Sequence, residues 1–281
     1  MLAAAVQLSC TSDESANLAT AEDLIRRAAG YGAGFVATPE GTNYLGPHQE
    51  KVARAEPLDG PTVSRFAALA AELSIHLLVG SVNERASDEE TARGRCYNTS
   101  VLLGPNGDRL AAYRKIHLFD VDVSDDVRFF ESDTCVPGTE VVTAATPLGT
   151  IGLSICYDLR FPELYRAHVD RGASILAVPS AFTLTTGKDH WTALLRARAI
   201  ETQCWVIAPG QHGKHDDGGL RESFGHSMII DPWGQVVAMA PDGVGLALTE
   251  IDPTRVERVR RGMPVQAHRQ AARARGTDVI R

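Results

Sequence analysis

Residues 146–164 read TPLGTIGLSICYDLRFPEL, and they place a cysteine between a short apolar segment and a helix start. Before Cys156, small and apolar residues alternate with glycine, which is typical of a buried strand. Pro162 suits the first turn of a helix, because proline lacks the N–H group that this turn leaves unpaired. The stretch therefore predicts a strand at 151–155, a turn that carries Cys156, and a helix at 162–171.

The same alternation of strand and helix continues in both directions from this stretch. Apolar residues at helical spacing predict further helices at 15–30, 60–74, 189–203 and near 253–261. Short apolar runs predict strands at 2–8, 35–40, 75–82, 175–180 and 204–209. Glycine turns within 98–115 (GPNG) and 227–240 (DPWG) indicate two antiparallel hairpins.

Two details of the helices are also predicted. Ser15 is the expected N-cap of the first helix, since serine side chains accept a hydrogen bond from the first turn. In the helix at 189–203 we expect Ile200 to face inward with Trp191, Leu194, Leu195 and Ala199.

Helix–strand alternation gives layers in which helices cover sheets, whereas hairpins give antiparallel sheet edges. Because both kinds of unit interleave over the whole length, the sequence predicts an α/β protein. Two sheets pack face to face with helices outside, as a four-layer α-β-β-α sandwich. No linker rich in Pro, Gly or Ser and no internal repeat divides the chain. We therefore expect a single domain over 1–281, in which 262–281 is a polar C-terminal tail.

The composition narrows the class of protein. The chain has 281 residues, of which 44% are hydrophobic and 22% charged, and this is typical of a soluble globular protein. No stretch approaches the roughly 20 apolar residues of a membrane span, and MLAAAVQLSC has no basic leader, so we expect a cytoplasmic protein. The five cysteines form no C-x-x-C pair, which favours free thiols over disulfides or a thiolate zinc site.

The charge is distributed unevenly along the chain. A formal net charge of −7 argues against nucleic-acid binding, yet residues 252–281 contain eight Arg against three acidic residues. A basic end on an acidic body can dock on that body, dock at a subunit interface, or stay solvated. The sequence leaves these three alternatives open.

Cys156 is the candidate nucleophile, since a thiol in a strand-to-helix turn lies beside backbone N–H groups that can hold an oxyanion. Glu40, at the end of a predicted strand, is a candidate general base. Lys115 closes the second arm of a hairpin and can hold a negative oxygen, and Glu131 can fix the position of that lysine. The alternative is a space-filling cysteine and three ordinary surface groups.

Four motifs around these residues resemble the catalytic motifs of the nitrilase superfamily, the carbon–nitrogen hydrolases. They are PEG (39–41), YRKIHLFD (113–120), FFES (129–132) and CYDLRFPE (156–163), and the candidate residues are 75, 16 and 25 positions apart, in the family's order. The resemblance covers nearly the whole chain. It implies an αββα sandwich, a homodimer or larger homo-oligomer, and no metal or organic cofactor.

The resemblance also implies amide hydrolysis through a thioester. Glu40 would act as general base and acid, Cys156 as nucleophile and Lys115 as oxyanion stabiliser, while Glu131 would position Lys115 and substrate. Residues 180–213 and 221–234 are most similar to the branch that contains the deaminated glutathione amidases, which is close to the omega-amidases that act on 2-oxoglutaramate. The implied substrate is a small amide whose acyl part carries a carboxylate and a 2-oxo group.

Four residues are candidates for binding that substrate. Arg160 is the first choice for the carboxylate because its planar guanidinium matches two oxygens, and an ion pair with Glu163 or Asp158 is the alternative. Phe182 and Thr186 resemble family positions that line the acyl pocket, and Tyr157 would flank the nucleophile. Ordinary loop packing is the alternative for these three.

Other interpretations remain possible from the sequence. In the first, Cys156 pairs with a histidine such as His190 or His117, as in cysteine proteases. In the second, the chain is a catalytically idle interaction module. In the third, it hydrolyses nitriles with the same four residues. QHGKHDDGG places His212, His215, Asp216 and Asp217 together, but a polar glycine turn is favoured over a metal site there.

Overall fold

The structure is a computed structural model that describes residues 1–124, 127–216 and 221–276. Two six-stranded sheets form its centre, in the orders β16-β1-β2-β3-β4-β5 and β15-β14-β11-β10-β9-β8. The first sheet contains β1 (Leu2–Gln7), β2 (Ala33–Ala37), β3 (His76–Arg85), β4 (Cys96–Leu103), β5 (Arg109–Arg114) and β16 (Gly245–Glu250). The second contains β8 (Thr143–Thr146), β9 (Gly149–Leu153), β10 (Ile175–Ala177), β11 (Trp205–Ala208), β14 (Met228–Ile230) and β15 (Val236–Met239). Two small hairpins pair β6 (Asp120–Ser124) with β7 (Val127–Phe130) and β12 (His212–Lys214) with β13 (Glu222–Phe224).

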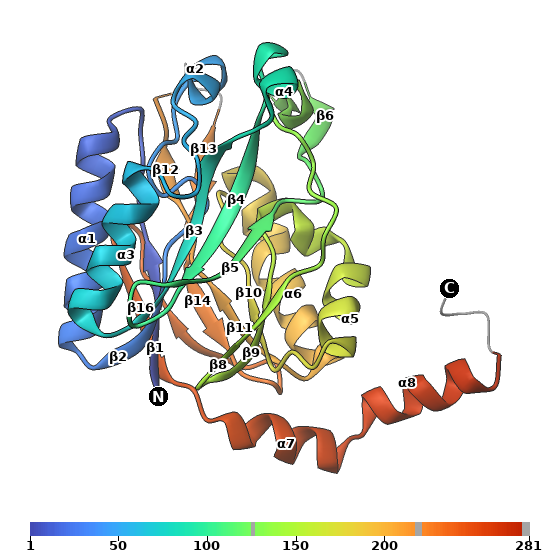
Figure 1. Ribbon diagram of the computed structural model, residues 1–281. Helices are drawn as coiled ribbons and strands as arrows, with labels where there is room; N and C mark the ends of the chain where they lie inside the picture. Colours follow the sequence, from blue (N-terminus) through green and yellow to red (C-terminus); the bar gives the residue numbers. More distant parts are fainter. Residues whose placement is uncertain (125–126, 217–220, 277–281) are drawn as a thin grey trace.

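Helices cover the outer face of each sheet. The helices α1 (Glu14–Gly30) and α3 (Pro61–Leu73) lie on the first sheet, and α5 (Pro162–Asp170) and α6 (Leu184–Thr202) on the second (Figure 1). The remaining helical segments are α2 (His48–Ala53), α4 (Asp88–Ala92), the 3₁₀ turns η1 (Glu131–Asp133) and η2 (Cys156–Arg160), and the C-terminal α7 (Pro253–Gly262) and α8 (Val265–Ala274). The predicted four-layer α-β-β-α sandwich is confirmed.

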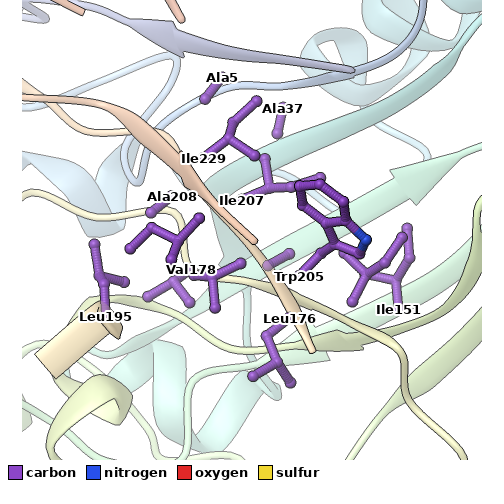
Figure 2. Packing of buried hydrophobic residues seen from close by; sticks show 14 of the residues in the cluster. Ala5, Ala37, Ile151, Leu176, Val178, Leu195, Trp205, Ile207, Ala208 and Ile229 are labelled. Atoms are coloured by element: carbon purple, nitrogen blue, oxygen red, sulfur yellow. The ribbon is translucent and has the colours of Figure 1, made fainter. Parts of the chain in front are cut away.

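Side-chain alternation along the strands explains the two hydrophobic cores. Because successive strand residues point to opposite faces, Ala4 and Val6 of β1 join the core under α1 and α3, whereas Ala3 and Ala5 join the core between the sheets. Figure 2 shows Ala5 and Ala37 of the first sheet close to Ile207 and Ile229 of the second. Small residues on one sheet thus leave room for branched residues on the other.

Three predicted details of the helices are wrong. The N-cap of α1 is Asp13 rather than Ser15, since the Asp13 side chain accepts a hydrogen bond from the backbone of Ala16 at 3.0 Å. The helix α6 begins at Leu184, five residues before the predicted start. Ile200 is 50% exposed, and Arg198 is buried on the inner face because it donates two hydrogen bonds to the Leu159 carbonyl.

The basic C-terminal segment docks on the body of its own chain. Arg255 pairs with Asp231, and Arg269 and Arg273 of α8 pair with Asp170 at the end of α5. Part of the segment expected as a polar tail is therefore helical, and α8 lies below α5 in Figure 1. Its packing at a subunit interface stays a prediction.

A close approach of two strands carries the first site residue into place. A Cβ atom at Gly80 of β3 would lie 2.0 Å from the carbonyl oxygen of Thr38 and 2.3 Å from that of Pro39. Only glycine allows this contact, which holds the turn leading to Glu40 against β3. Within the part of the chain that the structure describes, no helix has both the length and the apolar character of a membrane span.

Candidate active site

Cys156 lies in a strained turn where β9 ends and η2 begins. Its φ of 48° is in the left-handed region, which non-glycine residues rarely adopt and which is often associated with functional sites. The backbone N–H of Cys156 donates to the Pro179 carbonyl at 2.9 Å, and the residue is 8% exposed. The predicted strand, turn and helix around this cysteine are confirmed.

The carboxylate of Asp158 holds this turn against the segment that follows Lys115. One oxygen accepts hydrogen bonds from the Ile155 N–H at 2.8 Å and the Tyr113 hydroxyl at 2.7 Å. The other is 3.0 Å from the backbone nitrogen of His117 and 2.7 Å from its Nδ1. Asp158 is fully buried and thereby links the nucleophile's turn to the other sheet.

Lys115 is buried between two carboxylates. Its Nζ is 2.9 Å from Oε1 of Glu40 and 2.8 Å from Oε2 of Glu131. Burial acts to lower the pKa of Lys115, but the negative charges of Glu131 and Glu40 prevail and raise it well above its usual range. Burial acts to raise the pKa of Glu131, yet Lys115 prevails and lowers it to about 2. The lysine is therefore a fixed cation at neutral pH, and Glu131 is a fixed anion.

Glu40 is held at both of its carboxylate oxygens. Oε1 also accepts a hydrogen bond from Nδ2 of Asn98 at 2.9 Å, and Oε2 accepts one from the Ala181 N–H at 2.8 Å. Asn98 reaches Glu131 as well, at 3.2 Å, so that one amide bridges the two acids. Sequence reasoning missed Asn98, although its position across the predicted hairpin from Lys115 was a usable signal.

The surroundings of Cys156 keep its thiol protonated. Burial, followed by the negative charge of Glu40, raises the pKa of Cys156 well above its usual range, and Lys115 opposes this only in part. A free thiolate is therefore rare at neutral pH. A carboxylate beside a protonated thiol can accept its proton as the sulfur attacks, and the nearby ammonium can hold a developing oxyanion.

A single cleft contains these groups and the predicted substrate-binding residues. The cleft and its mouth together hold about 770 Å³ of empty space, part of which is open to solvent. Its lining includes all eight predicted site residues: Glu40, Lys115, Glu131, Cys156, Tyr157, Arg160, Phe182 and Thr186. The residues of the lining that sequence reasoning missed include Asn98, Tyr44, His48, Lys51, Phe119, Phe129 and Arg221. The roles of the eight stay predictions.

Arg160 lies on the wall of this cleft, with its guanidinium 5.8 Å from the ring centre of Tyr157 and 5.2 Å from that of Phe182. Among the described residues it forms no ion pair with Glu163 or Asp158, and the carboxylate of Asp158 instead binds the four donors of its own network.

The histidines named as alternatives are engaged elsewhere. His117 bonds to Asp158 and stacks on Phe161 at 3.7 Å, and Nδ1 of His190 is 3.3 Å from the Arg160 guanidinium. Neither forms a hydrogen bond with Cys156 in the described structure, which argues against a Cys–His pair.

The polar turn around His215 has a structural explanation. The ring of His215 bonds to the Cys10 carbonyl and the Ser223 hydroxyl, and Asp216 accepts hydrogen bonds from Ser12. Asp217 lies outside the described residues. Over residues 1–124, 127–216 and 221–276, no three metal-ligating side chains gather.

Comparison with known proteins identifies relatives over nearly the whole chain. The model of the carbon-nitrogen hydrolase family matches residues 2–261. A deaminated glutathione amidase of Synechocystis sp. is 44% identical over 95% of this chain and 97% of its own length. The omega-amidase NIT2 of Mus musculus is 38% identical over 95% of this chain and 94% of its own. Among solved structures, the C. elegans NitFhit protein aligns with a TM-score of 0.88 at 38% identity, over 95% of this chain and 64% of that longer chain.

The network around Asp158 gives a stability prediction. Replacing Asp158 by Asn turns one accepting oxygen into a donor that faces two donors, so we expect a loss of about 2–4 kcal/mol in the free energy of unfolding. Tyr113→Phe removes the two hydrogen bonds of the hydroxyl, which donates to Asp158 and accepts from the Ile116 N–H, and should cost about 1–2 kcal/mol. Urea unfolding measures both, with the exposed Asp23→Asn as control. An Asp158→Asn variant as stable as wild type would contradict the assigned network.

Proposed function

Since the chain belongs to the carbon–nitrogen hydrolase family and acts on amides, we propose that it works through a thioester on Cys156. The observation that carries this proposal is the buried Lys115, which fixes Glu40 and Glu131 beside the cysteine. Without the positive charge of Lys115, the two neighbouring carboxylates would repel each other. In the first step Glu40 takes the thiol proton while the sulfur of Cys156 bonds to the amide carbon.

The charge that develops on the carbonyl oxygen is held by the Lys115 ammonium and by a backbone N–H near Tyr157. Glu40 then gives its proton to the nitrogen as the C–N bond breaks, and the amine leaves. Next, Glu40 takes a proton from water, whose oxygen attacks the thioester carbon. The acid is released and the sulfur recovers a proton. Glu131 keeps Lys115 in place through both halves.

The proposed substrate is deaminated glutathione, with 2-oxoglutarate and cysteinylglycine as products. Support comes from the names of relatives that are 41–44% identical, and from Arg160, whose guanidinium lies in the cleft where an acyl carboxylate would bind. Phe182, Thr186 and Tyr157 would line the acyl part. The second candidate is omega-amidase action on 2-oxoglutaramate, which the 38% identical mouse omega-amidase favours.

We also propose that the enzyme assembles in the cytoplasm as a homodimer or larger homo-oligomer. Support comes from large apolar side chains that are exposed on or beside β15, the edge strand of the second sheet. These are Trp233, Val236, Val237 and Met239, each 39–54% exposed. An edge strand with such residues is suited to contact another subunit.

The substrate is tested with purified protein given deaminated glutathione and 2-oxoglutaramate in parallel, followed by mass spectrometry of the products. Faster release of cysteinylglycine and 2-oxoglutarate from the first supports the proposal. Faster ammonia release from the second makes the protein an omega-amidase. Hydrolysis of nitriles but not amides would contradict both.

We expect Cys156→Ala and Glu40→Gln each to lower turnover by at least about 10³-fold, since each removes one member of a unit that acts together. Circular dichroism should show an intact fold. Glu163→Gln, at an exposed position on α5, is the matched control for the second variant and should keep its activity. Near-normal turnover of Glu40→Gln would instead indicate a different base.

Arg160→Met should raise KM on the order of 10- to 100-fold and lower kcat much less, because a carboxylate bound equally in ground and transition states contributes uniform binding. Steady-state kinetics with deaminated glutathione measures this. Arg166→Met, at an exposed position on the same segment of chain, is the control. An unchanged KM would remove Arg160 from the binding site.

A further inference from the structure

The cleft contains a second buried cation, which the proposed mechanism does not use. Lys51 of α2 lines the cleft and is 7% exposed. Its Nζ donates to Sγ of Cys135 at 3.1 Å, and it meets no carboxylate at ion-pair distance among the described residues. An ammonium has three donors and a thiol is a weak acceptor, so most of its hydrogen-bonding capacity is unused.

This arrangement differs from that of Lys115, which has a carboxylate on either side. Burying an unpaired cation costs free energy. If Lys51 served packing alone, a neutral side chain at this position would cost less. Lys51 is therefore suited to meet an anion that enters the cleft. Arg221, which also lines the cleft and donates to the Gly46 carbonyl at 2.8 Å, adds a second positive charge on this side.

Ring contacts order the residues along the cleft wall. Starting from Arg160, the Tyr157 ring lies next, and its centre is 5.0 Å from that of Phe119. Phe119 is in turn 5.9 Å from Phe129. The Arg221 guanidinium lies 5.6 Å from the centre of the Phe129 ring, so the two arginines are at opposite ends of this row.

Lys51 belongs to the far end, away from Arg160. The His48 ring contacts Phe129 edge-on at 4.3 Å. Burial, followed by the charges of Lys51 and Arg221, lowers the pKa of His48 to about 2, which places both cations near a neutral imidazole. The Lys51 charge also acts on Glu131, beside Lys115. Lys51 is thus near Glu131, whereas Arg160 contacts Tyr157, the residue after Cys156.

Two cations of the cleft are not neutralised by the acids of the site. Lys115 is paired with both Glu40 and Glu131. Among the described residues, neither Lys51 nor Arg160 meets a carboxylate at ion-pair distance. Each of these two cations can therefore bind one carboxylate of a substrate, so the cleft is suited to a substrate with two carboxylates.

We propose that Lys51 binds a carboxylate on the leaving-group side of the scissile amide. The cleft then selects amides that carry one carboxylate on each side of the bond to be broken. This inference rests on the proposed function, in which Arg160 binds the acyl carboxylate. Deaminated glutathione has both carboxylates, the second on its terminal glycine, whereas 2-oxoglutaramate releases ammonia and has only the first.

The test compares deaminated glutathione with its glycinamide form, in which a neutral carboxamide replaces the terminal carboxylate. For wild type we expect kcat/KM to be at least about 10-fold higher for the carboxylate form, mainly through KM. In Lys51→Met this ratio should fall to about 1–2, and Lys51→Arg should restore part of it. Lys188→Met, at an exposed position of α6 outside the cleft, is the control and should keep the wild-type ratio.

A wild-type ratio of kcat/KM for the two forms near 1 overturns the proposal without any variant. The proposal can therefore be tested even if Lys51→Met folds poorly. A ratio that stays high in a folded Lys51→Met also overturns it. Calorimetric binding of both compounds to Cys156→Ala separates this inference from the proposed reaction. If wild type does not turn the substrate over, but the carboxylate form binds more tightly than the carboxamide form and Lys51→Met abolishes this difference, the proposed reaction is contradicted and the role of Lys51 is supported. If both forms bind equally, the role of Lys51 is overturned.

Discussion

The burial of the Lys115 ammonium is the constraint on which the rest of the site depends. A charge held out of water is costly unless it is paired, and here Glu40 and Glu131 both accept hydrogen bonds from the ammonium. Asn98 then bridges the two acids and keeps them from turning away. The ion pairs that burial requires also make the site rigid. Once the lysine is in place, the carboxylate of Glu40 has one orientation beside Cys156, and no rearrangement is needed when a substrate arrives.

The two-sheet architecture brings these groups together from distant parts of the chain. Glu40 follows β2 in the first sheet, and Cys156 follows β9 in the second, so neither sheet alone contains the site. Hydrogen bonds of the site cross between them: for example, the Ala181 N–H donates to Glu40, and the Asp158 carboxylate accepts from Tyr113 of β5. The face-to-face packing seen in Figures 1 and 2 is therefore what brings Glu40 and Cys156 together.

Much of this fold was predictable from the sequence, because strand and helix periodicity and motif order are local properties of the chain. The residues that were missed depend on tertiary contacts. Lys51 has no local pattern that distinguishes it from other polar residues, and the only signal for Asn98 was its position across the predicted hairpin from Lys115. The wrong prediction for the inner face of α6, where Arg198 and not Ile200 is buried, has the same cause. Helical periodicity identifies hydrophobic residues, but it gives no sign of the Leu159 carbonyl to which Arg198 donates. The N-cap of α1 was missed because Asp13 and Ser15 are both good caps two residues apart.

The central claim is that Glu40 and Lys115 serve a covalent step at Cys156. It is tested most directly by mixing the enzyme with deaminated glutathione, quenching the reaction in acid within milliseconds, and locating any adduct by peptide mass spectrometry. The account predicts a 2-oxoglutaryl thioester on the peptide that contains Cys156, formed before cysteinylglycine release reaches its steady rate. Substrate consumption at full rate with no adduct on Cys156, or with an adduct on another residue, would contradict it.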